Sequence, residues 1–502
     1  MHIPLDREQD VPLYLQIEEA LRRAILTGVF VDGDKLPSTR TLAAELAVSR
    51  LTVDNAYAEL AVSRLTVDNA YAELAAKGFL HQRRGSGAYV AHPQAQTRPA
   101  RPSSDAPFPL ESFTTLTSRL DGYADAPLPE GLINFAAGVG SPKVFPLEAF
   151  RKVLLSVLSR HAEEAFSYGE YCGYYPLRDT LSRILSAQGI PTQAEQVLIT
   201  NGSQHAISLV VQSLLAPGDT AIVEEPTYAE ALGLLRQHRV NIVTVPGDRH
   251  GMRVDLLPEL LERHRPKLIY TIPNFHNPTG RCLSEARRRR LLAIAQQAGV
   301  VILEDDFVGD LRYQGKQLPS LRALAQPGAV IYVSTFSKML LPSMRIGYLV
   351  ADSEHYQRFA RLKHVDSFTS SSLIQRALDA FVTVGRYDKQ LRRAGRVYRR
   401  HLEVMIDALQ RRLPPGCRFE TPQGGLFIWL TLPASVTTAE LMPVAWRYGV
   451  TFARGECFYA QEHLGAHGLR LNFAANSPPQ IEEGIARLCR AIEEVITEKN
   501  AG

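Results

Sequence analysis

One lysine has the surroundings of a reactive amine: Lys338, in the stretch IYVSTFSKMLLPSMRIGY at residues 331–348. Ile331 and Val333 belong to a β-branched run typical of a buried strand, and Lys338 follows where that strand would end. Such a lysine can form a Schiff base if desolvation lowers the pKa of its amine. The alternative is a buried strand whose lysine reaches solvent.

Groups that suit an anion surround this lysine. Thr335 and Ser337 offer hydroxyls in the turn after the strand. Arg345 adds a planar cation that suits a phosphate, on a segment with Gly347 that we predict to be helical. The segment TNGSQHA, residues 200–206, joins a predicted strand to a predicted helix. Backbone N–H groups of three of its residues would face an anion at that helix N-terminus: Gly202, Ser203 and Gln204.

Four more side chains lie on or just after predicted strands and could serve a planar ring or its ligand. Tyr228 could stack on a ring or be a core tyrosine. Asn277 could donate to a phenolate-like oxygen. Asp305 could hold a pyridine nitrogen protonated, or else cap a helix or form a salt bridge. Arg470 could bind a carboxylate with both guanidinium nitrogens, or be an ordinary surface arginine.

Alternating strand-like and helix-like segments would position these residues. From about residue 132 the pattern predicts an α/β domain with a mainly parallel sheet, ending in a smaller α+β unit. Because ligands of such sheets bind beyond the strand ends, the candidate residues would converge there. The predicted strands are 197–200, 220–225, 240–245, 267–272, 299–306 and 329–334.

The N-terminal residues have a different pattern. Residues 11–28 place apolar side chains four apart, which predicts an amphipathic helix ending at Gly28. Ser38 is a candidate N-cap for a short second helix, and a tight AVSR connection leads into LTVDNAYAEL. Short helix, turn and longer helix is the helix-turn-helix pattern. Residues 79–90, FLHQRRGSGAYV, predict two short strands that form a wing.

A tandem duplication interrupts this pattern. The segment AVSRLTVDNAYAEL occurs at 47–60 and again at 61–74, and the identity at a spacing of 14 runs from Ala44 to Ala75. Known repeat architectures use longer units and more copies, so this is no solenoid. Since the second copy leads directly into the wing, we expect it to supply the DNA-reading helix. The first copy would then replace the preceding helix, with overpacking that weakens DNA binding.

Length and composition limit the classes of protein to which this chain can belong. The 502 residues suggest two or more domains, and 45% hydrophobic with 22% charged residues is ordinary globular composition. A net charge of +4 indicates neither nucleic acid nor membrane by itself. Five cysteines without paired spacing argue against disulfides or zinc and fit a reducing cytoplasm. The sequence has no signal-peptide pattern and no apolar run of membrane-spanning length, so we expect no membrane partner.

Together, in this order, the motifs resemble known families. Residues 131–502 resemble fold-type-I pyridoxal 5'-phosphate (PLP) dependent aminotransferases. Residues 1–90, with LPSTRTLAAELAVSR and GSGAYV, resemble the GntR-type winged helix-turn-helix. Joined by a Pro- and Ala-rich linker at 91–130, they resemble the MocR-type transcriptional regulators. The resemblance implies a multidomain, PLP-binding, DNA-binding protein that forms a head-to-tail homodimer.

The resemblance also implies residue roles. Lys338 would bind the cofactor covalently, Asp305 would pair its ring nitrogen, Asn277 its ring hydroxyl, and Tyr228 would stack on it. Phosphate would be held by the helix N-terminus at 202–204 with Thr335, Ser337 and Arg345, and by Tyr168 from the partner subunit. Arg470 would bind the effector carboxylate. The family's tyrosine after the Asp305 position is missing, because Phe307 and Val308 stand there.

DNA contacts would depend on local placement, because residues 1–100 hold eleven Lys and Arg against twelve Asp and Glu. For each cation the alternative is a solvated helix face. The candidates in the helix and wing are Arg40, Ser63, Arg64, Thr66, Arg83 and Arg84.

Two functions remain open at this point. The first is a cytoplasmic regulator that senses an amino compound through PLP and binds an operator. The second is a working aminotransferase of the 2-aminoadipate-like kind with an impaired DNA-binding module. The duplication favours the second, and the missing tyrosine hydroxyl favours the first.

Overall fold

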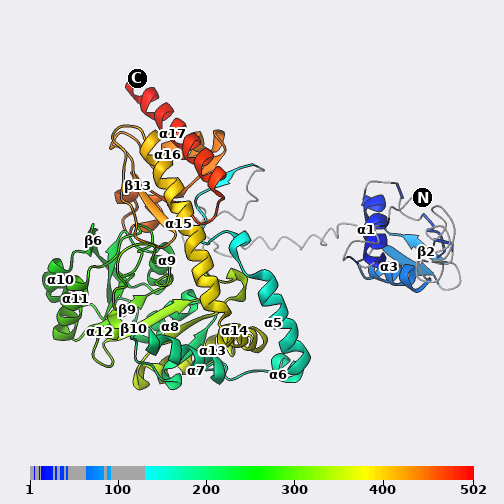
Figure 1. Ribbon diagram of the computed structural model, residues 1–502, viewed down its shortest axis with the longest axis horizontal. Coiled ribbons are helices and arrows are strands. Elements are labelled where there is room, and N and C mark those ends of the chain that lie inside the picture. The colour runs from blue at the N-terminus through cyan, green and yellow to red at the C-terminus, as the bar shows by residue number, and fades with distance from the viewer. Residues whose placement is uncertain are drawn as a thin grey trace, which may run out of the picture. The chain divides into compact units, whose positions relative to one another are not determined.

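The computed structural model describes residues 5, 11, 13–26, 29–30, 34–38, 41–42, 64–77, 79–83, 87–91 and 131–501. The chain divides into two compact units, Met1–Asp121 and Gly122–Gly502 (Figure 1). Within the described helices we find none that combines the length and apolar character needed to cross a membrane. Nowhere in the described parts do three His, Cys, Asp or Glu residues gather as metal ligands would.

The first unit packs two helices against a two-stranded wing. Helix α1 (Leu13–Leu26) and helix α3 (Arg64–Ala76) share a core with strands β1 (Leu80–Arg83) and β2 (Gly87–Val90). The predicted apolar stripe of α1 is confirmed, since Ile17, Leu21 and Ile25 are fully buried. β1 and β2 pair antiparallel, as expected for a wing. Ser38 accepts a hydrogen bond from the backbone N–H of Thr41 at 3.1 Å, as a capping residue does.

Helix α3 comes from the second copy of the duplicated segment. It begins at Arg64 and packs Ala70, Tyr71 and Leu74 into the core beside α1. The hydroxyl of Tyr71 donates to the carbonyl of Pro37 at 2.7 Å. The second copy therefore occupies the helix position next to the wing, as its direct connection predicted. Our expectation for the first copy, residues 47–60, lies outside the described residues.

The second unit is built on an eight-stranded sheet with the order β4-β11-β10-β9-β8-β5-β6-β7. Five central strands are parallel, namely β5 (Thr220–Glu225), β6 (Asn241–Asp248), β8 (Leu268–Thr271), β9 (Val301–Asp305) and β10 (Val330–Thr335). β11 (Gly347–Val350) runs antiparallel between β10 and β4 (Val197–Thr200), so β4 has the same direction as the five central strands. At the other edge, β7 (Gly251–Met252) pairs antiparallel with β6. The predicted mainly parallel sheet is confirmed.

Helices cover both faces of this sheet. Helices α10 (Leu257–His264), α11 (Glu285–Ala298) and α12 (Leu321–Leu324) pack on the face that holds Ile222, Ile269 and Ile302. The opposite face, with Val223, Tyr270 and Leu303, packs against α8 (Ser203–Leu214) and α9 (Ala229–Gln237). Because side chains alternate along a strand, Glu304 and Asp305 fall on opposite faces. Asp305 lies on the α8 side.

Our prediction of a helix around Arg345 and Gly347 was wrong. A short 3-10 turn, Pro342–Met344, ends at Arg345, whose φ of 49° reverses the chain. Gly347 then begins β11, which pairs antiparallel with β10 and β4. A Cβ on Gly347 would lie 2.6 Å from the backbone carbon of Gly202, so the sheet needs glycine there.

The remaining elements form the rim and the smaller α+β part predicted for the last hundred residues. Helix α15 (Arg386–Arg412, yellow in Figure 1) runs from beside α14 (Ser372–Thr383) to α17 (Pro478–Ala501). A four-stranded antiparallel sheet packs there: β12 (Arg418–Phe419), β13 (Phe427–Thr431), β15 (Ala453–Arg454) and β16 (Gly468–Asn472). The other elements are β3 (Ile133–Asn134), α5 (Leu147–Arg160), α6 (Ala162–Phe166), α7 (Tyr175–Ala187), α13 (Ser353–Ser367), α16 (Thr438–Arg447) and β14 (Val450–Thr451).

Candidate functional site

The candidate residues converge at the carboxyl ends of the parallel strands. Asp305 ends β9, Lys338 lies three residues after β10, and Asn277 lies in the loop after β8. Tyr228 caps α9 in the loop after β5, and Gly202 caps α8 in the turn after β4. The parallel register places these ends side by side, as the sequence pattern predicted.

Lys338 has the properties of a poised amine. Its Nζ donates to the backbone carbonyl of Gly138 at 2.9 Å. Desolvation by the surrounding protein lowers the pKa of Lys338 to about 8. At pH 7 about a tenth of such an amine is neutral, far more than of an ordinary lysine, and the neutral form is the one that attacks a carbonyl. The alternative of a lysine that simply reaches solvent does not fit this environment.

Asp305 offers one carboxylate oxygen to a ligand. Its Oδ2 accepts a hydrogen bond from the hydroxyl of Tyr270 at 2.9 Å. Its Oδ1 is fully buried and has no hydrogen-bond partner among the described residues. Burial raises the pKa of Asp305 to about 7. A protonated ring nitrogen next to Oδ1 would satisfy this atom, because an unpaired buried carboxylate oxygen is costly.

Asn277 and Arg470 hold each other in one orientation. Arg470, on β16, donates from Nη1 to the Oδ1 of Asn277 at 2.9 Å and from Nη2 to the carbonyl of Ala136 at 2.7 Å. A guanidinium only donates, so the amide oxygen must face Arg470 and the amide NH₂ must face away. The guanidinium lies over the rings of Phe427 and Phe458, with centroids at 4.2 and 5.0 Å.

An anion cradle forms where α8 begins. Gly202, with φ of 94°, caps this helix, and the N–H groups of its first turn have no intrahelical acceptor. A Cβ on Gly202 would lie 2.7 Å from Nη2 of Arg345, so glycine lets the guanidinium approach the helix end. Arg345 also donates to the carbonyl of Asn201 at 3.1 Å. Ser203 and Gln204 open the helix, and the Gln204 amide donates to the carbonyl of Glu230 at 3.1 Å.

The turn before Lys338 is held from within. The hydroxyl of Thr335 bonds to Ser337 Oγ at 3.1 Å and to the carbonyl of Ile346 at 3.2 Å. The backbone N–H of Ser337 donates back to Thr335 at 3.1 Å. Thr335 thus fixes the turn, and Ser337 is the hydroxyl carried next to Lys338.

Tyr228, Phe307 and Val308 are the residues that we associated with ring stacking and with the missing tyrosine. Tyr228 is half-buried against the main core, in a loop that Thr227 fastens through its backbone N–H to the carbonyl of Phe458 at 2.8 Å. Phe307 and Val308 are buried apolar side chains, and Phe307 stacks on Phe427 at 6.3 Å. Neither supplies a hydroxyl.

These residues fit PLP. A buried carboxylate oxygen suits the ring nitrogen, a fixed amide NH₂ suits the ring hydroxyl, and a cationic helix N-terminus suits the phosphate. A desolvated lysine suits the aldehyde.

Tyr168 does not join the group. It lies between α6 and α7, is 87% exposed, and contacts Phe368 with ring centroids 5.8 Å apart.

The DNA-binding candidates are only partly described. Arg64 and Thr66 begin α3 and Arg83 ends β1, but their side chains lie outside the described part. Arg40, Ser63 and Arg84 lie wholly outside it. Lys77, a further cation of this unit, forms an ion pair with the buried Glu18 at 3.1 Å. Its charge therefore compensates a buried carboxylate of the same unit.

Sequence reasoning missed Tyr270 and Gly138. Tyr270 is a hydroxyl in the middle of an otherwise apolar parallel strand, and a buried hydroxyl needs a partner. That was a usable signal. Gly138 gave none, because any residue can offer a backbone carbonyl.

Comparison with known proteins places the chain among two groups. The model of the aminotransferase class I and II family matches residues 131–488, and the model of the gntR family of bacterial regulatory proteins matches residues 13–62. Aromatic-amino-acid aminotransferase 1 of Thermococcus litoralis is 35% identical over 72% of this chain and 88% of its own length. The probable rhizopine catabolism regulatory protein MocR of Rhizobium meliloti is 31% identical over 96% of this chain and 94% of its own.

Among solved structures, the α-aminoadipate aminotransferase LysN of Thermus thermophilus has a TM-score of 0.72 and 33% identity. The match covers 77% of this chain and 99% of that one, which was crystallised with N-(5'-phosphopyridoxyl)-L-leucine.

Proposed function

Because this chain belongs to the aminotransferase class I and II family and, with its gntR-family region, to the MocR-type transcriptional regulators, we propose that it controls transcription in response to an amino compound bound next to Lys338. It is a DNA-binding regulator whose larger unit binds PLP. Because the regulators that resemble this chain are bacterial, we propose that it acts in the cytoplasm.

One observation carries this function. A single chain combines a winged helix-turn-helix unit with side chains that suit the ring nitrogen and the aldehyde of PLP, and regulators resemble it from end to end. The aminotransferases resemble only the larger unit. The regulatory function is therefore favoured over that of an aminotransferase with an impaired DNA module.

The larger unit would hold the cofactor through complementary charges. Asp305 would keep a proton on the ring nitrogen, since its Oδ1 has no other donor among the described residues. Asn277 would donate its NH₂ to the ring hydroxyl, and Tyr228 would stack on the ring. Ser337 and Arg345 would join the α8 N-terminus in holding the phosphate. When bound, PLP supplies an electron-poor carbonyl that reacts with primary amines.

Effector recognition would use the remaining charges. Arg470 is already fixed by Asn277 and Ala136, so it can receive a carboxylate with little loss of side-chain entropy. The effector's amine would compete with Lys338 for the cofactor. Release of Lys338 would shift the unit's conformation, and the linker would pass the change to two winged helices on DNA.

A head-to-tail homodimer would complete the site. Tyr168 contacts the exposed ring of Phe368, and Phe166 and Val365, two and three residues away from these in the sequence, are exposed as well; the exposed fractions of Phe166, Val365 and Phe368 are 74%, 83% and 57%. Such exposed apolar side chains are typical of an interface. We infer that a second copy of the chain covers these exposed apolar side chains, and that Tyr168 reaches the PLP phosphate in the site of that second copy. If so, Tyr168→Phe should weaken PLP binding while the protein remains a dimer of the same mass. An unchanged PLP affinity would contradict the proposed phosphate contact of Tyr168.

The test of the function compares two forms of the protein. The intact chain and a form without residues 61–74, both loaded with PLP, are titrated against the DNA upstream of the gene at one fixed salt concentration. Specific binding by either form supports the regulator. Binding by the shortened form alone shows that the duplication disables this copy. Binding by neither, together with turnover of an amino acid and a keto acid by the intact chain, would establish the enzyme instead.

A further inference from the structure

A row of cations lines the solvent face of α15. Between residues 389 and 400 the helix has no acidic residue, and its six exposed cations are Lys389, Arg392, Arg393, Arg396, Arg399 and Arg400. Their spacing of three and four keeps them on one side, opposite the buried Gln390, Ala394 and Tyr398. The row is about 16 Å long at a rise of 1.5 Å per residue.

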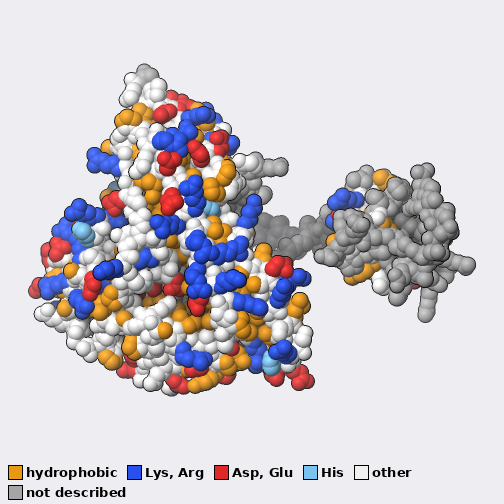
Figure 2. Space-filling view, viewed as in Figure 1, with side chains coloured by type: hydrophobic (Ala, Val, Ile, Leu, Met, Phe, Trp, Pro, Cys, Tyr) orange, Lys and Arg blue, Asp and Glu red, His pale blue; other side chains and the backbone are white. Residues whose placement is uncertain are grey.

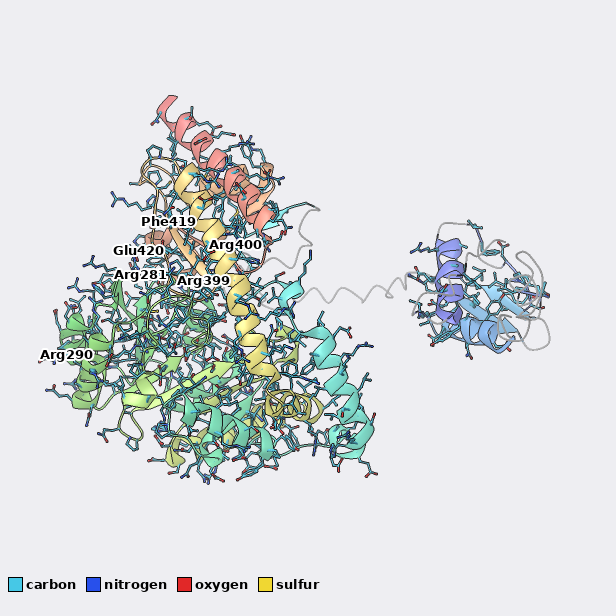
Figure 3. All side chains as sticks on the ribbon, in the orientation of Figure 1. Arg281, Arg290, Arg399, Arg400, Phe419 and Glu420 are labelled. Carbon is cyan, nitrogen blue, oxygen red and sulfur yellow. The ribbon has the colours of Figure 1, made fainter. Side chains whose placement is uncertain are left out.

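Few of these cations have acidic partners. Arg399 and Arg400 both pair with Glu403, at 3.2 and 3.7 Å. In the described chain no carboxylate lies within ion-pair distance of the other four. Arg393 donates to the backbone carbonyl of Lys143 at 3.4 Å. This contact brings Lys143, which is also exposed, next to the row of cations on α15. We call Lys143 and the six cations of α15 the α15 basic face. Figure 2 shows Lys and Arg side chains gathered over this helix, and Figure 3 labels Arg399 and Arg400 there.

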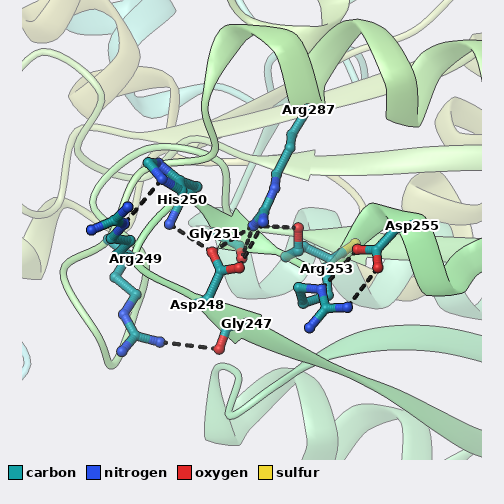
Figure 4. A network of polar contacts seen from close by, with 10 residues as sticks. Gly247, Asp248, Arg249, His250, Gly251, Arg253, Asp255 and Arg287 are labelled. Atoms are coloured by element: carbon teal, nitrogen blue, oxygen red, sulfur yellow. Dashed lines mark hydrogen bonds and ion pairs between the residues drawn. The ribbon is translucent and has the colours of Figure 1, made fainter.

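Another arginine-rich helix of the chain provides a contrast. In α11, Arg287 pairs with Asp248 at 2.6 Å and also donates to the carbonyls of Gly251 and Met252 (Figure 4). Arg288 is fully buried among backbone carbonyls, and Arg289 pairs with Glu285 at 2.8 Å. Those arginines stabilise the fold, whereas most cations of the α15 basic face have no carboxylate partner among the described residues.

The cost of this arrangement points to a polyanion. Like charges three and four residues apart destabilise a helix, and this face keeps them with little compensation. A concentrated positive field attracts and orients an anionic partner. A membrane surface fits poorly, because none of the large exposed hydrophobic side chains of the described chain lies on α15 and a membrane helix would insert some.

DNA fits better, for two reasons. Duplex DNA carries one phosphate per 3.4 Å of axis on each strand, so about five phosphates of one strand match the length of the row. The N-terminal 100 residues are charge-balanced, with eleven cations against twelve anions, so that region has little net charge with which to bind phosphates. We propose that the α15 basic face binds the phosphate backbone of DNA extending beyond the segment read by the winged helix. This inference rests on the proposed DNA-binding function.

The experiment uses the full chain loaded with PLP. A double variant of the basic face, Arg392→Glu with Arg396→Glu, is compared with the charge-matched control Arg290→Glu with Lys316→Glu, two exposed cations elsewhere (Arg290 is labelled in Figure 3). Binding to a long upstream duplex, and to a short one that holds only the winged-helix site, is measured by anisotropy over a series of salt concentrations. PLP content and circular dichroism verify that each variant is folded.

We expect the basic-face variant to lose salt dependence on the long duplex. Two lost phosphate contacts make the slope of log affinity against log salt shallower by about 1.8, at about 0.9 per contact. The control and the wild type should agree, and all three should agree on the short duplex. Equal slopes for variant and wild type on the long duplex overturn the inference and leave the regulator standing. If the wild type binds no DNA, the same substitutions are compared in the form without residues 61–74, and binding by neither form overturns both the inference and the regulator. A variant that loses binding to phosphatidylserine vesicles but not to DNA overturns the inference in favour of a membrane.

Discussion

The hydroxyl of Tyr270 donates to Oδ2 of Asp305 at 2.9 Å, and both side chains are almost fully buried. This bond occupies one carboxylate oxygen and leaves Oδ1 for the cofactor. Burial and the neighbouring Asp305 hold the pKa of Tyr270 well above its usual range, so the hydroxyl remains a donor at any ordinary pH. Tyr270 is therefore a positioning residue for the carboxylate.

We expect Tyr270→Phe to weaken PLP binding roughly tenfold, equivalent to about 1.4 kcal/mol, because a bond to a charged carboxylate is lost. The absorbance maximum of the bound cofactor should also shift. Tyr332→Phe is the matched control, since its hydroxyl donates to the adjacent Asp306 at 2.8 Å on the other face of the sheet. PLP affinity is measured by fluorescence titration. If both variants lose the same affinity, the effect of Tyr270→Phe is general destabilisation of the fold.

Capture of PLP by the cofactor-free protein should follow the ionisation of Lys338. Desolvation lowers the pKa of this amine to about 8, so the neutral form increases as pH rises and dominates above that value. The capture rate should increase from pH 6 and level off above about pH 8. A plateau near pH 10.5, the ordinary value for lysine, would show that the amine is not desolvated.

The attachment point can be checked on the same samples. Borohydride reduction and peptide mass spectrometry should locate the cofactor on Lys338. Lys363 is the internal control, because burial also lowers its pKa to about 8 and its amine also donates to a backbone carbonyl, that of Tyr171, but it lies on α13 and not in the turn after β10. Labelling of both lysines would show that the lowered pKa of the amine, and not the position of Lys338 in the site, determines where the cofactor attaches.

The two copies of the duplicated segment allow a matched test of the winged helix. Leu74 is fully buried, so Leu74→Ala should destabilise the first unit by about 2–5 kcal/mol. Leu60→Ala changes the equivalent residue of the first copy and should cost less. Thermal unfolding followed by circular dichroism measures both, and equal losses would mean that either copy can supply α3.

Arg470→Lys should separate carboxylate recognition from amine recognition. A lysine cannot form the paired contacts of a guanidinium, so amino acid effectors should bind roughly tenfold to a hundredfold more weakly, at about 1.5–3 kcal/mol. The same amine without its carboxylate should bind as it does to the wild type. If the amine without a carboxylate loses as much affinity as the amino acid, Arg470 only orients Asn277 and does not bind the effector carboxylate.

Several features could be predicted because they depend on local sequence. The apolar spacing of Ile17, Leu21 and Ile25 sets the buried face of α1, and the β-branched runs set the parallel strands. Strand ends also positioned Lys338, Asp305 and the Asn277 loop, since parallel strands share an edge. The segment at Arg345 and Gly347 was mispredicted because a strand there depends on pairing with β4, whose residues lie about 150 positions earlier in the sequence.

The two-part architecture, the proposed role of Lys338 and the duplicated helix could all be inferred from the amino-acid sequence, because each is encoded by neighbouring residues whose spacing and chemistry do not depend on the fold. The pairing of the polar groups, in contrast, could be seen only in the folded protein. Tyr270 meets Asp305, Arg470 meets Asn277, and the Gly138 carbonyl meets Lys338 across 35, 193 and 200 residues. Such partners are chosen by burial, since a polar group removed from water must bond to whichever donor or acceptor the packed chain brings to it.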